Sequence, residues 1–280
     1  MRVFVSGSGG YIGSVLVPHL REHGHEVTGY DILEQRDVRN TGLLEYFMQK
    51  QEAVIWLAAM SNNDWCVKNP QLHKSINVDA LECGITIAEH FKIPRFIYAS
   101  SVAAYGSVED ATEDRALDPT TPYGEAKARC ERALAISKLA WTVTRSASVC
   151  GPSPRLRIDI TVNKMWSDAK QKGFITVNGG EQKRCHIHID DLCEFYAMLL
   201  EKEVPLQTFN VVAENEKIVK TAVQVCKSMA NGHRRGIDMP YIMMKEPTDD
   251  RSYTVSGEKM RAFGFEPQFT VADAVRALNA

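Results

Sequence analysis

The sequence predicts an α/β protein in which a doubly wound parallel sheet is joined to a smaller C-terminal domain. Short apolar runs typical of buried strands alternate with amphipathic helical stretches through the first half of the chain. Such alternation is typical of a parallel sheet with right-handed crossovers. The first unit, VFVSGSGGYIGSVLVPHL, has the order strand, glycine-rich turn, helix. From Gly151 onward the alternation weakens, which favours a separate and less regular part.

The predicted elements follow from apolar runs for strands and from helical spacing of apolar residues for helices. We predict strands at 3–5, 25–30, 53–59, 95–101 and 141–149, and helices at 75–91 and 121–138.

The glycine-rich turn after the first strand has the spacing of a dinucleotide site. Gly7, Gly10 and Gly13 recur every third residue, which allows a tight turn, a close approach of pyrophosphate and close packing of the helix. The helix N-terminus then offers free N–H groups to the phosphates. Asp31 directly follows the second predicted strand, 18 residues after Gly13, where a carboxylate accepts from a ribose 2′-hydroxyl and repels a 2′-phosphate. We therefore predict NAD as the cofactor, in preference to NADP.

These features predict a Rossmann-type sheet and a domain division. We expect residues 1–150 to form the NAD-binding domain, with 186–213 returning to it as a helix and a strand. Residues 151–280 are expected to be mainly substrate-binding. A chain of 280 residues is long enough for one large α/β domain or two joined ones.

Composition excludes several other classes of protein. The net charge of −2 favours neither nucleic acid nor an anionic membrane surface. No apolar run reaches the length of a membrane span, and the first predicted strand leaves no room for a signal peptide. The seven scattered cysteines form no C-x-x-C pair, so we expect reduced thiols, no metal site and a cytoplasmic location.

Three residues form a candidate catalytic group. Tyr123 and Lys127 are four apart at the start of a predicted helix, so their side chains share one face. Ser101 ends a predicted parallel strand, at the sheet edge where ligands bind in this class. A phenol is a poor base at neutral pH, but a nearby ammonium lowers its pKa. The group therefore fits removal of a hydroxyl proton during hydride transfer.

The chain resembles the extended short-chain dehydrogenase/reductases, in particular the NAD-dependent nucleotide-sugar epimerase/dehydratase family. The segments that carry the resemblance run through nearly the whole chain in the family's order: GSGGYIG (7–13), DV (37–38), LAAMS (57–61), YASSVAAYG (98–106), YGEAK (123–127), RCHIHIDDL (184–192) and DDRSYTVS (249–256).

The resemblance implies roles for particular residues. Ser101, Tyr123 and Lys127 would be catalytic. The expected contacts to NAD are Gly7, Gly10, Tyr11, Ile12, Gly13, Asp31, Asp37, Val38, Leu57, Ala58, Ala59, Tyr123 and Lys127. The expected contacts to a nucleotide-sugar substrate are Ser101, Tyr123, Asn163, Arg184 and Arg251, the two arginines holding the diphosphate. We assign no catalytic or metal role to His186 and His188.

The sequence also departs from its relatives. Val102 and Ala103 stand where 4,6-dehydratases of the family carry an Asp-Glu pair, which argues against that elimination. Ser153 stands where relatives that couple 3,5-epimerisation place a histidine. Ser148 replaces an asparagine that often touches substrate, and the stretch from Asp31 to Asp37 is short, as in a branch that reduces 4-keto sugars.

Three functions remain open from the sequence. The first is an NAD-dependent nucleotide-sugar epimerase, acting at C4 by transient oxidation. The second is a nucleotide-sugar 4-ketoreductase or dehydrogenase that uses the same residues, and the third is a non-catalytic cofactor sensor. The family also implies a homodimer formed by helices 80–91 and 124–138, although their apolar residues could equally face their own sheet.

Overall fold

The computed structural model describes residues 1–202, 204–231, 240–247 and 251–280. The chain divides into two compact units. The first contains residues 1–106, 113–145 and 193–209, and the second contains 107–112, 146–192 and 210–280. Residues 193–209 of the first unit lie within the span 186–213 that the sequence predicts to return to the NAD-binding domain, and β9 (Lys183–His188) pairs with strands of the second unit. The division of function between 1–150 and 151–280 stays a prediction.

The first unit is built around a parallel sheet. Its strands and helices are β1 (Arg2–Ser6), α1 (Gly13–Glu22), β2 (Glu26–Tyr30), α2 (Thr41–Met48), β3 (Ala53–Trp56), α3 (Asn63–Lys68), α4 (Pro70–Lys74), α5 (Ala80–His90), β4 (Arg95–Ser101), α6 (Pro122–Ala135) and β6 (Trp141–Ser146). Two further elements, α8 (Ile189–Glu201) and β10 (Gln207–Val211), cross the division between the units. Short helical turns occupy Ile32–Glu34, Ser75–Asp79 and Val102–Tyr105.

The strand order in this sheet is β10-β6-β4-β3-β1-β2. The chain moves from β1 outward to β2 and then returns to place β3 on the other side of β1, and both pairings are parallel. The order therefore reverses between β1 and β3. In open α/β sheets the carboxyl ends of the strands at such a reversal form the ligand crevice.

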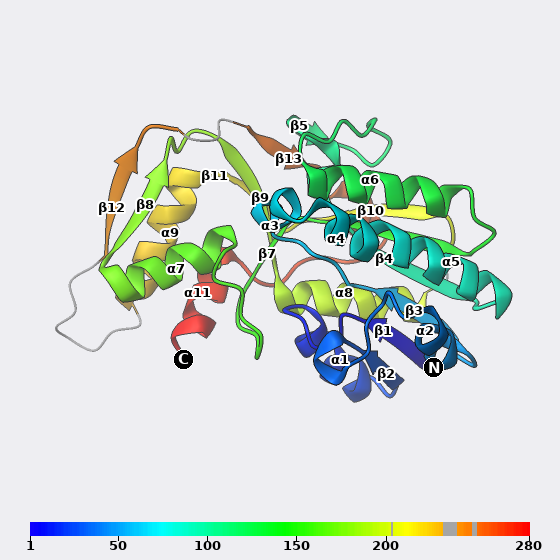
Figure 1. Ribbon diagram of the computed structural model, residues 1–280. Helices are drawn as coiled ribbons and strands as arrows, with labels where there is room; N and C mark the ends of the chain where they lie inside the picture. Colours follow the sequence, from blue (N-terminus) through cyan, green and yellow to red (C-terminus); the bar gives the residue numbers. More distant parts are fainter. Residues whose placement is uncertain (203, 232–239, 248–250) are drawn as a thin grey trace. The chain divides into compact units, whose positions relative to one another are not determined.

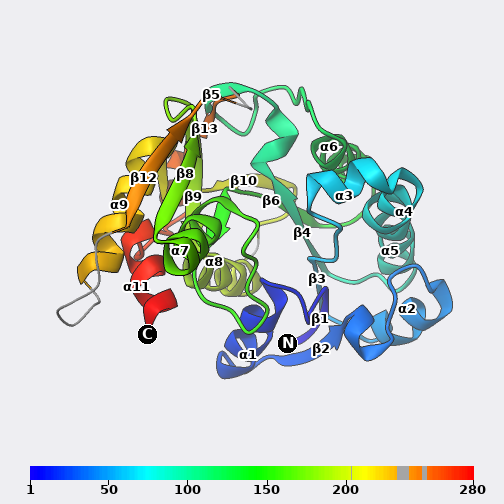
Figure 2. The ribbon, with the colours of Figure 1, turned by 60° about the vertical axis from the view of Figure 1, so that its left-hand side comes forward.

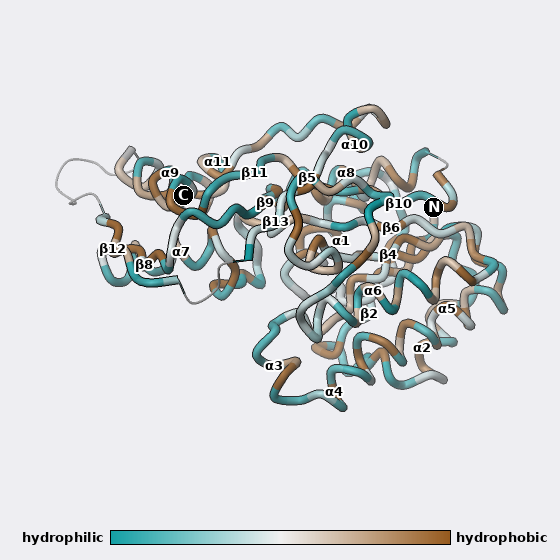
Figure 3. The backbone as a smooth tube through the Cα atoms, turned by 90° about the horizontal axis from the view of Figure 1, so that it is seen from above, coloured by the Kyte–Doolittle hydropathy of each residue, from teal (hydrophilic) through white to brown (hydrophobic). Residues whose placement is uncertain are grey.

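Helices cover both faces of this sheet. Figure 2 shows α2, α5 and α6 along one face and α1 and α8 along the other. The strands are apolar because both faces are covered; Val3, Phe4 and Val5 of β1 are all fully buried. Hydrophobic and hydrophilic stretches alternate along the tube of α2 and α5 (Figure 3), as expected for helices with one buried face. The predicted doubly wound α/β fold is confirmed.

The ends of several elements have local causes. Thr121 accepts a hydrogen bond from Gly124 N at 3.1 Å and caps α6, and Pro122 occupies its first turn. The predicted strand 141–149 is two strands, because the chain leaves the large sheet after β6 and joins another sheet as β7 (Ser148–Cys150). The predicted helix 75–91 begins with an irregular turn at Ser75–Asp79 before α5.

In the described residues of the second unit, the strands form three small sheets, with orders β11-β9-β7, β12-β8 and β13-β5. Its other elements, labelled in Figure 1 where there is room, are β5 (Val108–Ala111), α7 (Thr161–Lys172), β8 (Phe174–Asn178), β11 (Glu214–Lys217), α9 (Ile218–Asn231), β12 (Tyr241–Lys245), β13 (Tyr253–Val255), α10 (Glu258–Ala262) and α11 (Val271–Asn279). A core of buried apolar residues from α7, α9, α11 and β8 holds this unit together. Among the described residues, no helix is both long and apolar enough to cross a membrane.

Candidate active site

The glycine turn lies at the carboxyl end of β1 and packs against the end of β3. Gly7 has φ of +73°, and a Cβ at this position would lie 2.8 Å from Ala58 N. A Cβ at Gly13 would lie 2.1 Å from the carbonyl oxygen of Gly7. Ala58 N also donates to Ser6 Oγ at 3.3 Å. The turn and the segment that contains Leu57 and Ala58 are therefore neighbours at the point where the strand order reverses.

The N-terminus of α1 follows this turn directly. Gly10 N donates to Gly7 O at 3.0 Å, and Ser14 N donates to Gly10 O at 3.0 Å. Among the described residues, no side chain caps this helix at Ile12, and its first turn carries no acidic residue. In the part of the chain that the structure describes, the only atom close to a Cβ added at Gly10 is Gly7 O, at 3.2 Å. This backbone can therefore receive an anion, as a dinucleotide phosphate requires.

The structure brings Asp31 to the glycine turn. Its carboxylate accepts from Gly9 N at 3.0 Å and from Leu33 N at 2.9 Å, and the residue is buried. A Cβ at Gly9 would lie 3.0 Å from Asp31 Cγ. Gly9 is not among the predicted cofactor residues, although its position beside Gly10 in the glycine-rich turn was a signal for it. The acid expected at the ribose thus lies beside the turn expected at the phosphates.

Asp37 and Val38 follow the short turn after β2. The carboxylate of Asp37 forms a fork with Arg39, and this hydrogen bonding holds the pKa of Asp37 below its usual value. Tyr30 donates from its hydroxyl to the Asp37 carbonyl at 2.9 Å, which ties this segment to the end of β2. Val38 is buried. The contacts of Asp37 and Val38 with adenine stay predictions.

Ser101, Tyr123 and Lys127 come from two elements that pack together. Ser101 ends β4, and its Oγ accepts from Ala103 N at 3.2 Å. Tyr123 and Lys127 lie in the first turns of α6. A Cβ at Gly124 would lie only 2.5 Å from the Ala103 carbonyl oxygen, so α6 begins directly against the residues that follow Ser101. All three predicted catalytic residues therefore lie where the end of β4 meets the start of α6.

Lys127 is buried between two tyrosine rings. Its Nζ lies 4.6 Å from the centre of the Tyr98 ring and 5.6 Å from that of Tyr123, and it donates to the carbonyl of Ala99. Burial lowers the pKa of Lys127 to about 8, although the nearby Glu131 acts in the opposite direction. The ammonium is still the main form at pH 7. It is therefore placed to stabilise a negative charge on Tyr123.

A buried ion pair behind these residues was not predicted. The Arg145 guanidinium binds the Glu131 carboxylate at 2.7 Å, and both side chains are less than a tenth exposed. Glu131 also accepts from Ser100 Oγ, and Arg145 donates to the hydroxyl of Tyr105 at 2.6 Å. The network joins α6 to β4, β6 and the turn after Ser101. Glu131 follows Lys127 by one helical turn, and that spacing was the available signal.

The predicted substrate residues belong to the second unit. The Arg184 guanidinium lies 4.4 Å from the centre of the Tyr253 ring and donates to the carbonyl of Arg251. Asn163 is fully buried; it accepts from Gly151 N and donates to the Arg157 carbonyl, both at 3.1 Å. These bonds give Asn163 a role in shaping the segment after Gly151. Substrate contact by Asn163, Arg184 and Arg251 stays a prediction, and two residues of the DDRSYTVS motif, 249 and 250, lie outside the described residues.

The two histidines of β9 are interior groups. His186 is 1% exposed, and burial lowers its pKa to about 4. His188 accepts from Asp190 N at 3.1 Å through Nδ1 and packs its ring 4.8 Å from that of Phe269. Both contribute to the packing of the second unit.

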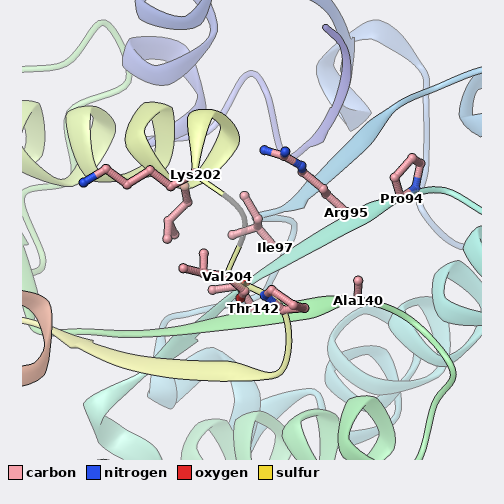
Figure 4. A pocket seen from close by; sticks show the side chains of 9 residues that line it. Pro94, Arg95, Ile97, Ala140, Thr142, Lys202 and Val204 are labelled. Carbon is pink, nitrogen blue, oxygen red and sulfur yellow. Dashed lines mark hydrogen bonds between the residues drawn. The ribbon is translucent and has the colours of Figure 1, made fainter. Parts of the chain in front are cut away.

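A cavity of about 170 Å³ lies at the other end of β4. Its lining includes Arg95 at the start of β4, Thr142 at the start of β6, and Lys202 and Val204 after α8 (Figure 4). Because β4 runs from Arg95 to Ser101, this cavity lies at the amino edge of the sheet and Ser101 at the carboxyl edge. It is therefore not the candidate active site.

The chain is similar to several known proteins over its whole length. It is 27% identical to the UDP-glucose 4-epimerase of Lactobacillus helveticus, over 99% of this chain and 95% of that protein. It is 22% identical to the human dTDP-D-glucose 4,6-dehydratase, over 98% of this chain and 88% of that protein. Among solved structures, the Bacillus cereus UDP-glucuronic acid 4-epimerase in complex with UDP-glucuronic acid and NAD matches with a TM-score of 0.85 at 21% identity, over 100% of this chain and 98% of that one.

The family follows from the motifs, the sheet topology and a match that covers most of the chain. Residues 3–212 match the NAD dependent epimerase/dehydratase family, for which the cofactor is NAD. The chain thus belongs to the NAD dependent epimerase/dehydratase family and is an enzyme of the extended short-chain dehydrogenase/reductase type.

Proposed function

We propose that this protein is a nucleotide-sugar epimerase that inverts C4 by transient oxidation to a keto sugar. The observation that carries the proposal is the group of Ser101, Tyr123 and Lys127. The two residues after Ser101 are Val102 and Ala103 rather than carboxylates. Valine and alanine have no ionisable side chain, so the two residues after Ser101 supply neither an acid nor a base. The similarity over 99% of the chain to a UDP-glucose 4-epimerase supports the same activity.

The residues of the first unit fit NAD. Side chains at Gly7 or Gly13 would collide with backbone atoms, so the turn keeps its backbone open beside the N-terminus of α1. We propose that this backbone holds the pyrophosphate and that Asp31 holds the adenosine ribose. Lys127 would donate to the nicotinamide ribose. When bound, NAD supplies reversible acceptance of a hydride.

Tyr123 would be the base that removes the proton from the C4 hydroxyl and later returns it. Its phenolate needs a nearby positive charge, and the Lys127 ammonium, 5.6 Å from the centre of the ring, supplies one. Ser101 would donate a hydrogen bond to the reacting oxygen. Inversion requires the keto sugar to present its other face before the hydride returns. The residues of the second unit, above all Arg184 and Arg251, would hold the nucleotide diphosphate during that rotation.

A 4-ketoreductase or dehydrogenase is the second candidate. The short stretch from Asp31 to Asp37 favours it, because this feature is shared with the branch that reduces 4-keto sugars. The carboxylate of Asp31 favours NAD over NADPH, the usual donor for biosynthetic reductions, and so argues for the epimerase.

The proposal includes a cytoplasmic homodimer, whose association can be measured by analytical ultracentrifugation. In the first unit, the apolar residues Leu81, Ile85 and Ile87 of α5 are buried within their own unit. Between α5 and α6 lies the exposed ion pair of Glu82 with Arg129. A dimer through these helices would therefore rest on polar contacts as well as on the exposed Ile136, just after α6.

A turnover assay on UDP-, dTDP- and GDP-sugars, including 4-keto forms, tests the function. Sugar stereochemistry is followed by NMR and NADH by its absorbance in the same sample. Inversion at C4 with no net change in NADH is expected for the epimerase. One NADH consumed or released per sugar converted would instead establish the reductase or dehydrogenase and overturn the proposal.

A further inference from the structure

We propose that His19, His23 and Glu194 form a binding site for one divalent transition-metal ion, with Zn²⁺ as the best match. The site lies in the first unit, between α1 and α8, and uses no residue of the candidate active site. His19 and His23 are four apart, at the C-terminal end of α1, so their rings lie on the same face of the helix. Glu194 reaches them from α8, 175 residues after His19.

The ligand atoms already have the spacing of a coordination sphere. Glu194 Oε2 lies 3.0 Å from His19 Nε2 and 3.6 Å from His23 Nε2, and one ligand atom from each of the three residues lies within 4.8 Å of the others. Zn²⁺ bonds of about 2.0–2.1 Å in a tetrahedral site place neighbouring ligand atoms about 3.3 Å apart. Small side-chain rotations would therefore suffice to accept the ion.

The ring of His23 is set in the tautomer that binds a metal. Its Nδ1 lies 2.9 Å from the backbone carbonyl oxygen of His19. Because a carbonyl oxygen only accepts, Nδ1 must carry the hydrogen, and Nε2 then carries the lone pair in the neutral ring. Metal-binding histidines usually donate their second ring nitrogen in this way, which fixes the ring and raises its basicity. His23 Nε2 lies 3.6 Å from Glu194 Oε2, so both atoms could bind the same ion.

The position and chemistry of the cluster favour a transition metal. The side chains are 24%, 32% and 51% exposed for His19, His23 and Glu194, so an ion can enter from solvent and water can complete its coordination. Two imidazoles and one carboxylate suit Zn²⁺, whereas Mg²⁺ and Ca²⁺ prefer oxygen ligands alone. The sequence predicts no metal site, because a pair of histidines four apart gives little signal without the distant Glu194. A bound ion would join the end of α1 to α8 and stabilise the fold.

The experiment measures Zn²⁺ binding by the full chain after treatment with a chelator. Zn²⁺ is titrated against a chromophoric competitor, and Co²⁺ is added separately to record the visible d–d band of a protein-bound ion. We expect one Zn²⁺ per chain in competition with the chromophore. Loss of a residue that merely orients a ligand costs 10–100-fold in affinity, so removing a ligand with His23→Ala should weaken binding at least about 100-fold. Glu194→Gln keeps the shape of the side chain and should weaken binding in the same direction.

His90→Ala is the matched control, because His90 is an exposed histidine at the end of α5. It should bind Zn²⁺ as the unmodified chain does. Circular dichroism of each variant shows whether the fold is kept, which is expected because the three ligands are partly exposed. Failure of the unmodified chain to bind one Zn²⁺ overturns the proposal. So does equal affinity in the His23→Ala and His90→Ala variants, since the ion would then be bound elsewhere.

Discussion

At the scale of single residues, Tyr123 separates proton transfer from cofactor binding. Tyr123→Phe keeps a ring 5.6 Å from the Lys127 ammonium and loses only the hydroxyl. Turnover of the active nucleotide sugar should fall at least ~100-fold because general base catalysis is removed, while NAD stays bound. Steady-state rates and the NAD content of the purified protein measure the two effects. Tyr46→Phe, at an exposed position on α2, should change neither. Unchanged turnover in Tyr123→Phe would show that Tyr123 is not the base.

Asp31 is the residue expected to select NAD. Asp31→Ala should weaken NAD binding and narrow the preference for NAD over NADP, because the 2′-hydroxyl loses its acceptor and the 2′-phosphate loses a repelling charge. The same change also removes the acceptor of Gly9 N and Leu33 N. Asp31→Asn is therefore the control, since it removes the charge and keeps an acceptor for the turn. The dissociation constants of both variants and of the unmodified chain for NAD and for NADP measure this preference. A preference that both variants retain would mean that Asp31 does not face the ribose.

At the scale of elements, the strand–turn–helix unit depends on one close approach. Gly13→Ala would place a methyl group 2.1 Å from the carbonyl oxygen of Gly7, so the turn or α1 must shift. We expect lower thermal stability and at least tenfold weaker NAD binding. Gly42→Ala, in α2, is the control, because among the described residues the nearest atom to the added Cβ would be Asn40 Oδ1, at 4.0 Å. Thermal unfolding and NAD titration of both variants test this. Normal NAD affinity in Gly13→Ala would contradict the assigned role of the turn.

The ion pair of Glu131 with Arg145 holds α6 to the sheet. Removing one partner of a buried pair costs about 3–5 kcal/mol, because the other charge stays buried and uncompensated. Glu131→Ala should therefore lower the free energy of unfolding by about that amount. Glu82→Ala breaks the exposed pair with Arg129 and should cost less than about 1 kcal/mol. Urea unfolding compares the two. Equal losses of unfolding free energy in the two variants would mean that the buried ion pair stabilises the fold no more than the exposed pair does.

At the scale of the whole molecule, buried His186 links stability to pH. Its pKa is about 4 in the folded chain and 6.5 for an exposed imidazole. Between these values the unfolded chain binds a proton that the folded chain does not, so the free energy of unfolding falls as the pH falls from 6.5 to 4. The full loss from this group is roughly 3 kcal/mol.

His186→Leu should remove this contribution and flatten the dependence of unfolding on pH. Urea unfolding at several pH values between 4 and 7 measures it against the unmodified chain. The exposed control His90→Ala should follow the unmodified chain. If the curve of His186→Leu runs parallel to that of the unmodified chain, another group causes the acid sensitivity.

How far the sequence predicts the structure varies with the range of the interaction. The predicted strand 95–101 is β4, and the predicted helix 121–138 contains α6. Both depend on local apolar spacing and on end signals such as Thr121 and Pro122. The predicted strand 141–149 is broken at Ala147, because its two halves join different sheets. Apolar character alone does not tell which sheet a strand will join.

Local patterns in the chain were enough to predict the fold class, the family, the glycine turn and the pairing of Tyr123 with Lys127. These features follow from backbone sterics and helical period, which act over a few residues. Tertiary packing selects which distant groups meet: Asp31 with Gly9, Glu131 with Arg145, and Glu194 with His19. Such contacts depend on strand order and on the packing of helices against the sheet. A local pattern carries no information about them, because the partners are brought together only when the sheet assembles.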